Sequence, residues 1–283
     1  MKAFIESIKN ALHPYYNLSE ADFIAYNLVE KFCSVSKIAI LSGKDLPISA
    51  QQELQIQEAI KDLQKYKPLQ YVLGEAFFYG NYFDVSPAVL IPRPETEELV
   101  SKTAKILEKQ CPQAHILDVG TGSGCIAISL ALALPQAKLT ALDLSEEALQ
   151  IAKKNAKKLK VEINFIQADI LTWKNEKHLL WDCIISNPPY VCENEKSTMQ
   201  KNVLDYEPTT ALFVPDAQPL LFYEKIILFA KKYLRQGGFL FFEINEKFGE
   251  EIAFLLQKND FAEIVILQDF YGKDRFAKAQ KKS

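Results

Sequence analysis

Hydrophobic and polar positions change their spacing at about residue 114. From Ala114 onward, short apolar runs alternate with longer segments whose apolar residues recur every three to four positions, which is typical of strands alternating with helices. This spacing predicts strands near 115–119, 138–142, 162–166, 181–186, 238–245, 261–268 and 275–279. It predicts helices near 123–134, 145–158, 219–235 and 246–258. The alternation indicates an α/β domain built on a largely parallel sheet.

Residues 2 to about 66 contain helical signals and no strand signal. Ser19, with Asp22 three residues later, is expected to cap the second helix, and Ser49 is expected to cap a later one. The inner face of that later helix is expected to consist of Leu54, Ile56, Ala59, Ile60 and Leu63. These helices are either a packing module or a docking surface for a protein partner, and the sequence does not decide between the two.

A hairpin is expected between the helical segment and the α/β domain. Residues 76–90 are aromatic and β-branched, and Gly80-Asn81 is a turn signal. Residues 66–74 form the connection that precedes it. A helix is expected from Glu95 to about Gln110, because the acids in its first turn suit the helix dipole.

The C-terminal strands depart from a purely parallel arrangement. Asp269 to Arg275 is a tight loop between two predicted strands, so an antiparallel hairpin is expected at the edge of the sheet. Lys278 to Ser283 are expected to be a frayed tail.

Composition narrows the class of protein. A chain of 283 residues can bury a sizeable core in one or two domains, and a net charge of −3 gives no general drive toward nucleic acid. The five cysteines are scattered without a Cys-x-x-Cys pair, which fits reduced thiols in the cytosol better than disulfides or a metal site. No signal-peptide core is present, and the longest mostly apolar run, 125–134, is too short to span a bilayer. We expect a cytoplasmic protein with no metal, no membrane association and no direct nucleic-acid binding.

One short motif suggests chemistry on a planar NH₂ group. Ser186-Asn187-Pro188-Pro189-Tyr190 follows an apolar run, and its two prolines stop the strand and remove backbone donors. The oxygens of Asn187 and Pro188 can therefore accept the two hydrogens of an NH₂ group, while the ring of Tyr190 stacks on its plane. A rigid turn that leaves a buried strand is the alternative, and the motif alone is short enough to occur by chance.

A glycine-rich turn, Gly120-Thr121-Gly122-Ser123-Gly124, lies between a predicted strand and a predicted helix. It lets a ligand lie against the backbone, and the helix offers free N–H groups. A dinucleotide site would need its third glycine at Cys125, so the spacing disfavours a nicotinamide cofactor. Asp143 ends the next strand, where its carboxylate can accept both hydroxyls of a ribose. Ser145 already suits the cap of the following helix, which favours a ligand role for Asp143.

Together these stretches resemble the class I S-adenosylmethionine-dependent methyltransferases, and members of that class with Asn-Pro-Pro-Tyr/Phe/Trp act on planar amide or amino nitrogens. Arg93-Pro94-Glu95-Thr96-Glu97 narrows the resemblance to the HemK/PrmC family, the protein-(glutamine-N5) methyltransferases of peptide chain release factors. The resemblance runs from about Tyr71 onward. It implies a Rossmann-like seven-stranded α/β sheet with an antiparallel last strand, plus a small N-terminal helical domain. The implied boundaries are a helical docking domain at 1–70, a linker with a hairpin at 71–92 and the methyltransferase domain at 93–283.

The resemblance also implies site residues. The glycine-rich turn would take the methionine part of S-adenosylmethionine, and Asp169 would accept from the adenine amine. Ile170 aligns with the position that flanks the adenine, and Trp173 is the alternative source of that contact. The implied cofactor-binding set is Gly120, Thr121, Gly122, Ser123, Gly124, Asp143, Asp169, Ile170, Trp173 and Asn187. The implied catalytic residues are Asn187, Pro188 and Tyr190, and Pro189 joins them in binding the substrate.

The implied reaction is methyl transfer from S-adenosylmethionine to the side-chain amide of the glutamine in the Gly-Gly-Gln motif of class 1 release factors, a step that serves translation termination. A glutamine of a ribosomal protein is an alternative substrate. An adenine-N6 nucleic-acid methyltransferase is another reading, although the sequence has no large insertion or basic run for target recognition. A non-catalytic binding module is a further alternative, and the intact glycines, Asp143 and Asn187 argue against it.

Other polar residues complete the expectations. Arg93 and Glu97 are either an exposed ion pair at spacing i, i+4 or part of the pocket rim. Tyr206 to Phe213 resembles a family stretch, Glu-Pro-x-x-Ala-Leu, but lacks the glycines that usually follow, so no site is assigned there. Residues 192–203 are polar and are expected to be a mobile segment over the substrate. The histidines belong to no catalytic constellation and are expected to be structural or at the surface: His13, His115 and His178.

Overall fold

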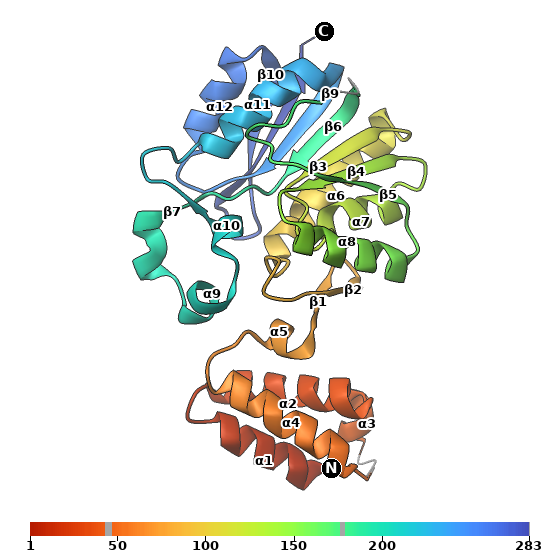
Figure 1. Cartoon of the computed structure of the whole chain (residues 1–283), viewed down its shortest axis with the longest axis vertical. Helices are drawn as coiled ribbons and strands as arrows, with labels where there is room; N and C mark the ends of the chain where they lie inside the picture. The colour runs from red at the N-terminus through yellow and green to blue at the C-terminus, as the bar shows by residue number, and fades with distance from the viewer. Residues whose placement is uncertain (43–46, 176–178, 283) are drawn as a thin grey trace. The chain divides into compact units, whose positions relative to one another are not determined.

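The structure is a computed structural model that describes residues 1–42, 47–175 and 179–282. It consists of two compact units (Figure 1). Met1–Glu75 and Gln200–Tyr206 form the helical unit, and Ala76–Met199 and Glu207–Ser283 form the sheet unit. This division differs from the sequence-based one, because residues 71–75 and 200–206 belong with the helices. The hydroxyl of Tyr206 donates a hydrogen bond to the Lys65 carbonyl at 3.0 Å, which ties the second of these segments to the helical unit.

The helical unit contains amphipathic helices around one apolar core, which includes Ile8, Leu28 and Ile56. Its helices are α1 (Lys2–Leu12), α2 (Leu18–Cys33), α3 (Lys37–Leu41), α4 (Ala50–Leu63), α5 (Leu69–Leu73) and α9 (Lys201–Tyr206). All regular secondary structure in the described residues before 67 is helical, as the spacing predicts.

Two details of the helical unit differ from the expectation. Asn17, not Ser19, caps α2: its side-chain oxygen accepts from the Glu20 amide at 3.0 Å, and the Ser19 hydroxyl bonds to the same oxygen. Leu54 points away from the core and is 53% exposed. Ser49 does cap α4, in a reciprocal capping box with Gln52.

The sheet unit alternates strands and helices after an initial hairpin. Its first elements are β1 (Glu75–Phe78), β2 (Asn81–Asp84), α6 (Pro94–Gln110), β3 (His115–Val119), α7 (Cys125–Ala133), β4 (Lys138–Asp143), α8 (Glu146–Leu159), β5 (Ile163–Gln167) and β6 (Trp181–Ser186). They are followed by β7 (Val191–Cys192), the 3₁₀ helix η1 (Glu193–Thr198), α10 (Thr209–Leu212), β8 (Phe213–Val214), α11 (Leu221–Tyr233), β9 (Leu234–Glu243), α12 (Gly249–Lys258), β10 (Phe261–Gln268) and β11 (Asp274–Lys281).

The central sheet has the order β10-β11-β9-β6-β3-β4-β5. β3 pairs in parallel with β4 and β6, β4 with β5, and β6 with β9, whereas β11 is antiparallel to both of its neighbours. The seven-stranded sheet with one inserted antiparallel strand is therefore confirmed. The prediction of a frayed tail from Lys278 is wrong, because β11 runs to Lys281. Lys281 pairs with Phe261 in the sheet, and its side-chain amine donates to the Leu234 carbonyl at 2.7 Å.

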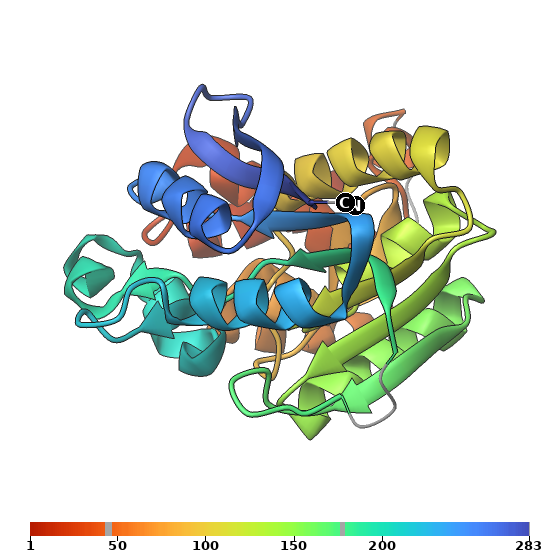
Figure 2. The same cartoon turned by 90° about the horizontal axis from the view of Figure 1, so that it is seen from above.

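Helices cover both faces of the twisted sheet (Figure 2). One apolar core joins Ile116 and Ile185 to α6, α7 and the hairpin, and the other joins Leu117 and Ile184 to α11 and α12. Neighbouring strand residues point to opposite faces, so one strand supplies both cores. The strands are therefore long apolar runs, as expected of a sheet buried on both sides.

The polar segment after residue 192 is not an irregular loop. β7 pairs in parallel with β8, and the amide of Asn194 in η1 donates to Asp216 at 3.0 Å. The side chain of Glu195 accepts from the Cys192 amide at 2.9 Å and pairs with Lys247. The segment has short regular elements held by these contacts, and its expected mobility over the substrate stays a prediction.

Candidate active site

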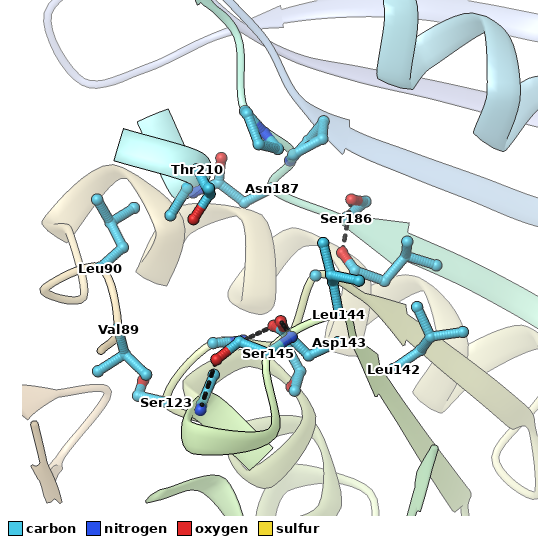
Figure 3. Close-up of a pocket in the computed structure, with 18 of the residues that line it drawn as sticks. Val89, Leu90, Ser123, Leu142, Asp143, Leu144, Ser145, Ser186, Asn187 and Thr210 are labelled. Carbon is cyan, nitrogen blue, oxygen red and sulfur yellow. Dashed lines mark hydrogen bonds between the residues drawn. The ribbon is translucent and has the colours of Figure 1, made fainter. Parts of the chain in front are cut away.

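A cavity of about 430 Å³ lies in the sheet unit, at the carboxyl ends of β3, β4 and β6. β3 is the strand at which the chain order of the sheet reverses, and such switch points are where open α/β sheets bind ligands. Figure 3 shows Asn187 and Thr210 on one side of this cavity, and Asp143, Ser145 and Ser123 on the other. The cavity volume is within the ordinary range for small-ligand sites.

Most of the residues that the sequence suggested meet in this cavity. Those that line it are Gly120, Thr121, Gly122, Ser123, Asp143, Asp169, Ile170, Asn187, Pro188 and Pro189. Gly124, Trp173 and Tyr190 are not among the lining residues.

The glycine-rich turn holds its shape through its own backbone. The amides of Gly120 and Thr121 donate to the Leu142 carbonyl at 2.8 and 3.0 Å, which joins the turn to the end of β4. Gly124 does not line the cavity; it is the N-cap residue of α7. With φ at +82°, a Cβ there would lie 2.9 Å from Ile128 Cδ1, so only glycine fits. The N-cap residue, Gly124, makes no side-chain hydrogen bond to α7, and Asp118 accepts from one amide of the first turn, that of Ala127.

Asp143 receives backbone donors at the end of β4. Its carboxylate oxygens accept from the Gly122 amide at 2.8 Å and from the Ser145 amide at 2.9 Å. Burial raises the pKa of Asp143, and the backbone hydrogen bonds act in the opposite direction. The hydroxyl of Ser145 caps α8 by accepting from Ala148 at 3.1 Å. The Leu144 amide is a third backbone donor to this carboxylate, which still has a lone pair for a ligand hydroxyl.

The sequence reasoning overlooked Asp118, a fully buried acid on β3. One carboxylate oxygen accepts from the Thr121 hydroxyl at 2.6 Å and from the Ala127 amide at 3.2 Å. Asp118 therefore connects β3 to the glycine-rich turn and to the first turn of α7. Burial raises its pKa to about 7, and the charge of Asp143 adds to the effect. The sequence did contain a signal for this residue: Asp118 is an acid near the end of an apolar strand, two positions before the first glycine of the turn.

The Asn-Pro-Pro-Tyr segment is anchored at the end of β6. The Ser186 hydroxyl donates to the Val119 carbonyl at 2.7 Å. The Asn187 Nδ2 group donates to the Thr96 hydroxyl at 3.2 Å, and the Tyr190 hydroxyl donates to Glu243 at 3.1 Å. Tyr190 packs against the apolar core below α11 and does not line the cavity, while Asn187 and the two prolines form part of the cavity wall.

The wall that contains Asp169 and Ile170 does not include Trp173, the alternative residue for the adenine contact. Asp169 and Ile170 line the wall, but the turn that follows carries Trp173 away, and its ring stacks on Phe229 at 5.1 Å between centroids. Phe222 on α11 supplies an aromatic side chain to the wall instead. Nothing in the linear sequence distinguished Phe222 from the other apolar residues of its helix.

Arg93 at the rim has a different partner from the expected one. It pairs with the buried carboxylate of Glu207 rather than with Glu97. The second oxygen of Glu207 accepts from the Ile91 amide at 3.1 Å. The stretch before α10, to which the sequence assigned no site, therefore ties down the loop that precedes α6, and both Arg93 and Pro208 line the cavity.

Comparison with known proteins agrees with this geometry. The PrmC N-terminal domain matches residues 6–74, and the methyltransferase small domain matches residues 97–206. A release factor glutamine methyltransferase of Bacteroides thetaiotaomicron is 42% identical over 97% of this chain and 98% of its own. One of Flavobacterium psychrophilum is 42% identical over 98% of each chain.

The chain belongs to the release factor glutamine methyltransferase family. A crystal structure of a methyltransferase from Pyrococcus furiosus, 17% identical, has a TM-score of 0.53 and covers 83% of this chain and all of its own, which supports the fold. As a member of the family, the protein is an enzyme, and its methyl donor is S-adenosylmethionine.

Burial raises the pKa of Cys125, which lines the cavity, to about 12, so it is a thiol and not a nucleophilic thiolate at neutral pH. No cluster of metal-ligating side chains occurs in the described parts of the chain. No helix among the described residues is long and apolar enough to cross a membrane. His178 lies outside the described residues, His13 follows the end of α1, and His115 begins β3.

Proposed function

We propose that this protein transfers a methyl group from S-adenosylmethionine to the side-chain amide nitrogen of the glutamine in the Gly-Gly-Gln motif of class 1 peptide chain release factors. Family membership supports this substrate, since the relatives are named for it. The observation that carries the chemistry is the orientation of Asn187, whose NH₂ group is bonded to Thr96 and whose oxygen is left to accept. The reaction would take place in the cytoplasm, where release factors act.

The cavity fits the methyl donor. Asp143 is suited to the ribose hydroxyls, and the turn at 120–124 is suited to the methionine part. The buried hydroxyl of Ser123 lies in the cavity lining beside the thiol of Cys125, which is a weak hydrogen-bond partner, and could bond to a ligand instead. Asp169 and Ile170 would flank the adenine, and Phe222 extends that apolar wall.

Alignment is the task of the protein in this reaction. The bound sulfonium supplies a strongly electrophilic methyl group, whereas an amide nitrogen is a poor nucleophile because its lone pair is delocalised. The Asn187 side-chain oxygen and the Pro188 carbonyl would accept the two amide hydrogens and turn the nitrogen toward the methyl group. Tyr190 would pack on the amide plane. The proton would leave after transfer, to water.

The decisive experiment is incubation of the enzyme with methyl-labelled S-adenosylmethionine and three separate substrates: a release factor, ribosomal proteins and DNA. Label should appear on the glutamine of the Gly-Gly-Gln motif. The matched control is a release factor in which that glutamine is replaced by glutamate, which has no NH₂ group and should take up no label. Label on a ribosomal protein alone, or on DNA alone, would replace this proposal with the corresponding activity.

A further inference from the structure

The wall behind Asn187 contains a buried carboxylate that the reaction described above does not use. Glu243, at the end of β9, is 1% exposed, and Thr96, in the first turn of α6, is 2% exposed. The Thr96 hydroxyl lies 2.6 Å from one Glu243 oxygen, and the Tyr190 hydroxyl lies 3.1 Å from the other. Thr96 is also the partner of Asn187 Nδ2, at 3.2 Å. One carboxylate is thus connected to both polar side chains of the Asn-Pro-Pro-Tyr motif.

The direction of these hydrogen bonds follows from the groups themselves. Both oxygens of Glu243 accept, one from the Thr96 hydroxyl and the other from the Tyr190 hydroxyl, so the single hydrogen of the Thr96 hydroxyl is directed to Glu243. The Thr96 oxygen can then only accept from its other neighbour. The Asn187 atom that faces Thr96 must therefore be the NH₂ group, and the Asn187 oxygen must face the other way. A flipped amide would bring two acceptors together.

Hydrogen bonds and a nearby positive charge counteract the effect of burial on the Glu243 carboxyl group. Burial raises the pKa of Glu243, while the hydrogen bonds from Thr96 and Tyr190 and the charge of Arg275 oppose that rise. The first turn of α6 supplies the positive end of a helix dipole beside the carboxylate. The Tyr223 hydroxyl donates to the Glu243 main-chain carbonyl at 3.1 Å, which fixes the end of the strand.

We propose that Glu243 and Thr96 are positioning residues for methyl transfer: they select the one orientation of the Asn187 amide whose oxygen can receive the hydrogens of the substrate NH₂ group. The same carboxylate fixes the ring of Tyr190 through its hydroxyl. This inference rests on the proposed function of Asn187, and it names residues that act through Asn187; Thr96 is among the residues that line the cavity, and Glu243 is not.

The first test compares two substitutions at Thr96. Thr96→Val keeps the shape and removes the hydroxyl, so the amide of Asn187 loses its directing partner. We expect kcat to fall about 10–100-fold at saturating substrates, with the Kd for S-adenosylmethionine changed less than about 3-fold. Thr96→Ser keeps the hydroxyl and should keep kcat within about 3-fold of the wild type. A Thr96→Val enzyme with wild-type kcat would overturn the proposal.

Thr103→Val is the matched control. Thr103 lies on the same helix and is 0% exposed, and its hydroxyl has no hydrogen-bond partner among the described residues. This substitution removes a buried hydroxyl from α6 without touching the Asn187 network, so kcat should be unchanged. An equal loss of kcat in Thr103→Val and Thr96→Val would mean that both substitutions act through the packing of α6. That result would contradict a role of Thr96 in positioning Asn187.

A second readout responds to the amide orientation itself. A release factor whose glutamine is replaced by glutamate should inhibit the wild type weakly, because the Asn187 oxygen faces its carboxylate. In Thr96→Val and in Glu243→Gln the amide of Asn187 can turn, and its NH₂ group can then bond that carboxylate. The inhibition constant should fall at least about 3-fold relative to the wild type, a change that a purely structural role would not produce. An unchanged inhibition constant in both variants contradicts the proposal.

The two proposals fail in different ways. If the wild type labels a ribosomal protein or DNA instead of a release factor, the proposed substrate is wrong. The Thr96→Val and Thr96→Ser enzymes are then measured with the substrate that is labelled. If the wild type labels the release factor and the Thr96→Val and Glu243→Gln enzymes match it in kcat and inhibition, the positioning inference alone falls.

Discussion

Asp143 and Asn187 face each other across one cavity, yet their substitution should have different kinetic effects. Asp143 is expected to bond the methyl donor in the ground state and the transition state alike. Asn187 is expected to act on the substrate amide as it reacts. Uniform binding and transition-state alignment appear separately in Kd and kcat, so each residue gives its own prediction.

Asp143→Ala should chiefly weaken binding of S-adenosylmethionine. The charge-assisted hydrogen bonds to the ribose are lost, and the Gly122 and Ser145 amides lose their acceptor at the same time. We expect a loss of about 1.5–3 kcal/mol in binding free energy, measured by isothermal titration calorimetry. Asp182→Ala, which removes a carboxylate from β6 away from the cavity lining, is the control. Equal affinities in the wild type and Asp143→Ala would exclude a ribose contact.

Asn187→Ala should chiefly lower turnover, by about 10²–10³-fold, as for the loss of one preorganised polar group at a reacting centre. Asn187→Asp is the sharper variant, because it keeps an acceptor oxygen and adds a charge that attracts the sulfonium. That enzyme should bind S-adenosylmethionine and remain slow, because its carboxylate cannot donate to Thr96. Calorimetry paired with kcat at saturation distinguishes the two effects. Wild-type turnover by Asn187→Ala would rule out the alignment mechanism.

Asp118 makes the stability of the protein depend on pH. Its pKa rises from 3.8 when unfolded to about 7 when folded, so the folded protein keeps a proton that the unfolded chain releases. Its contribution to stability is full below about pH 4 and is lost as the pH rises through 7. Asp118→Asn stays neutral, and its stability relative to the wild type should rise with pH by up to roughly 4 kcal/mol. Urea unfolding at pH 5 and pH 7.5 should show about 2.5 kcal/mol of this change, and parallel curves would contradict it.

At the scale of elements, Glu207 joins the loop before α6 to the start of α10. Its side chain in the Arg93 pair is 1% exposed, while that of Arg93 is 33% exposed. Glu207→Ala leaves the Ile91 amide and the guanidinium without their acceptor. We expect it to lower the free energy of unfolding by about 3 kcal/mol, at the low end for a broken buried pair because Arg93 remains partly hydrated.

The control for Glu207 is an exposed carboxylate in a similar pair. Glu193→Ala removes the partner of Lys196, and both side chains there are largely exposed, so the cost should be below about 1 kcal/mol. Urea unfolding of both variants under one set of conditions gives the comparison. Similar costs at the two positions would mean that the Glu207 clamp adds no more than a surface ion pair does.

At the scale of the whole molecule, the cavity belongs to one unit. Every residue that lines it falls between 88 and 226, and none falls in 1–75 or 200–206. A protein that begins at Ala76 should therefore bind S-adenosylmethionine with a Kd within about 3-fold of the full chain. If the helical unit docks the release factor, the KM for that protein should rise at least about 10-fold. An unchanged KM would leave the helices with a packing role only.

Local patterns in the sequence determined much of this protein. Strand and helix periodicities reflect side-chain directions that depend only on neighbours along the chain, so β3 to β6 and α6 to α8 could be predicted. The glycine turn, Asp143 and Asn187 are local as well, because each stands at the end of a predicted strand. Errors arose where a local rule had two solutions: Asn17 and Ser19 both suit a cap, and only the structure selects Asn17.

The tertiary structure decided which residues far apart in the sequence become partners. Arg93 bonds Glu207 across 114 positions and Thr96 bonds Glu243 across 147, because the loop before α6, the start of α10 and the end of β9 meet at one edge of the sheet. The pairing of Lys281 with Phe261 turned an expected tail into a strand, and the turn after β5 directed Trp173 to Phe229 while Phe222 lines the cavity. The sequence could name the residue that faces the substrate, but the orientation of its amide depends on a carboxylate that only folding brings beside it.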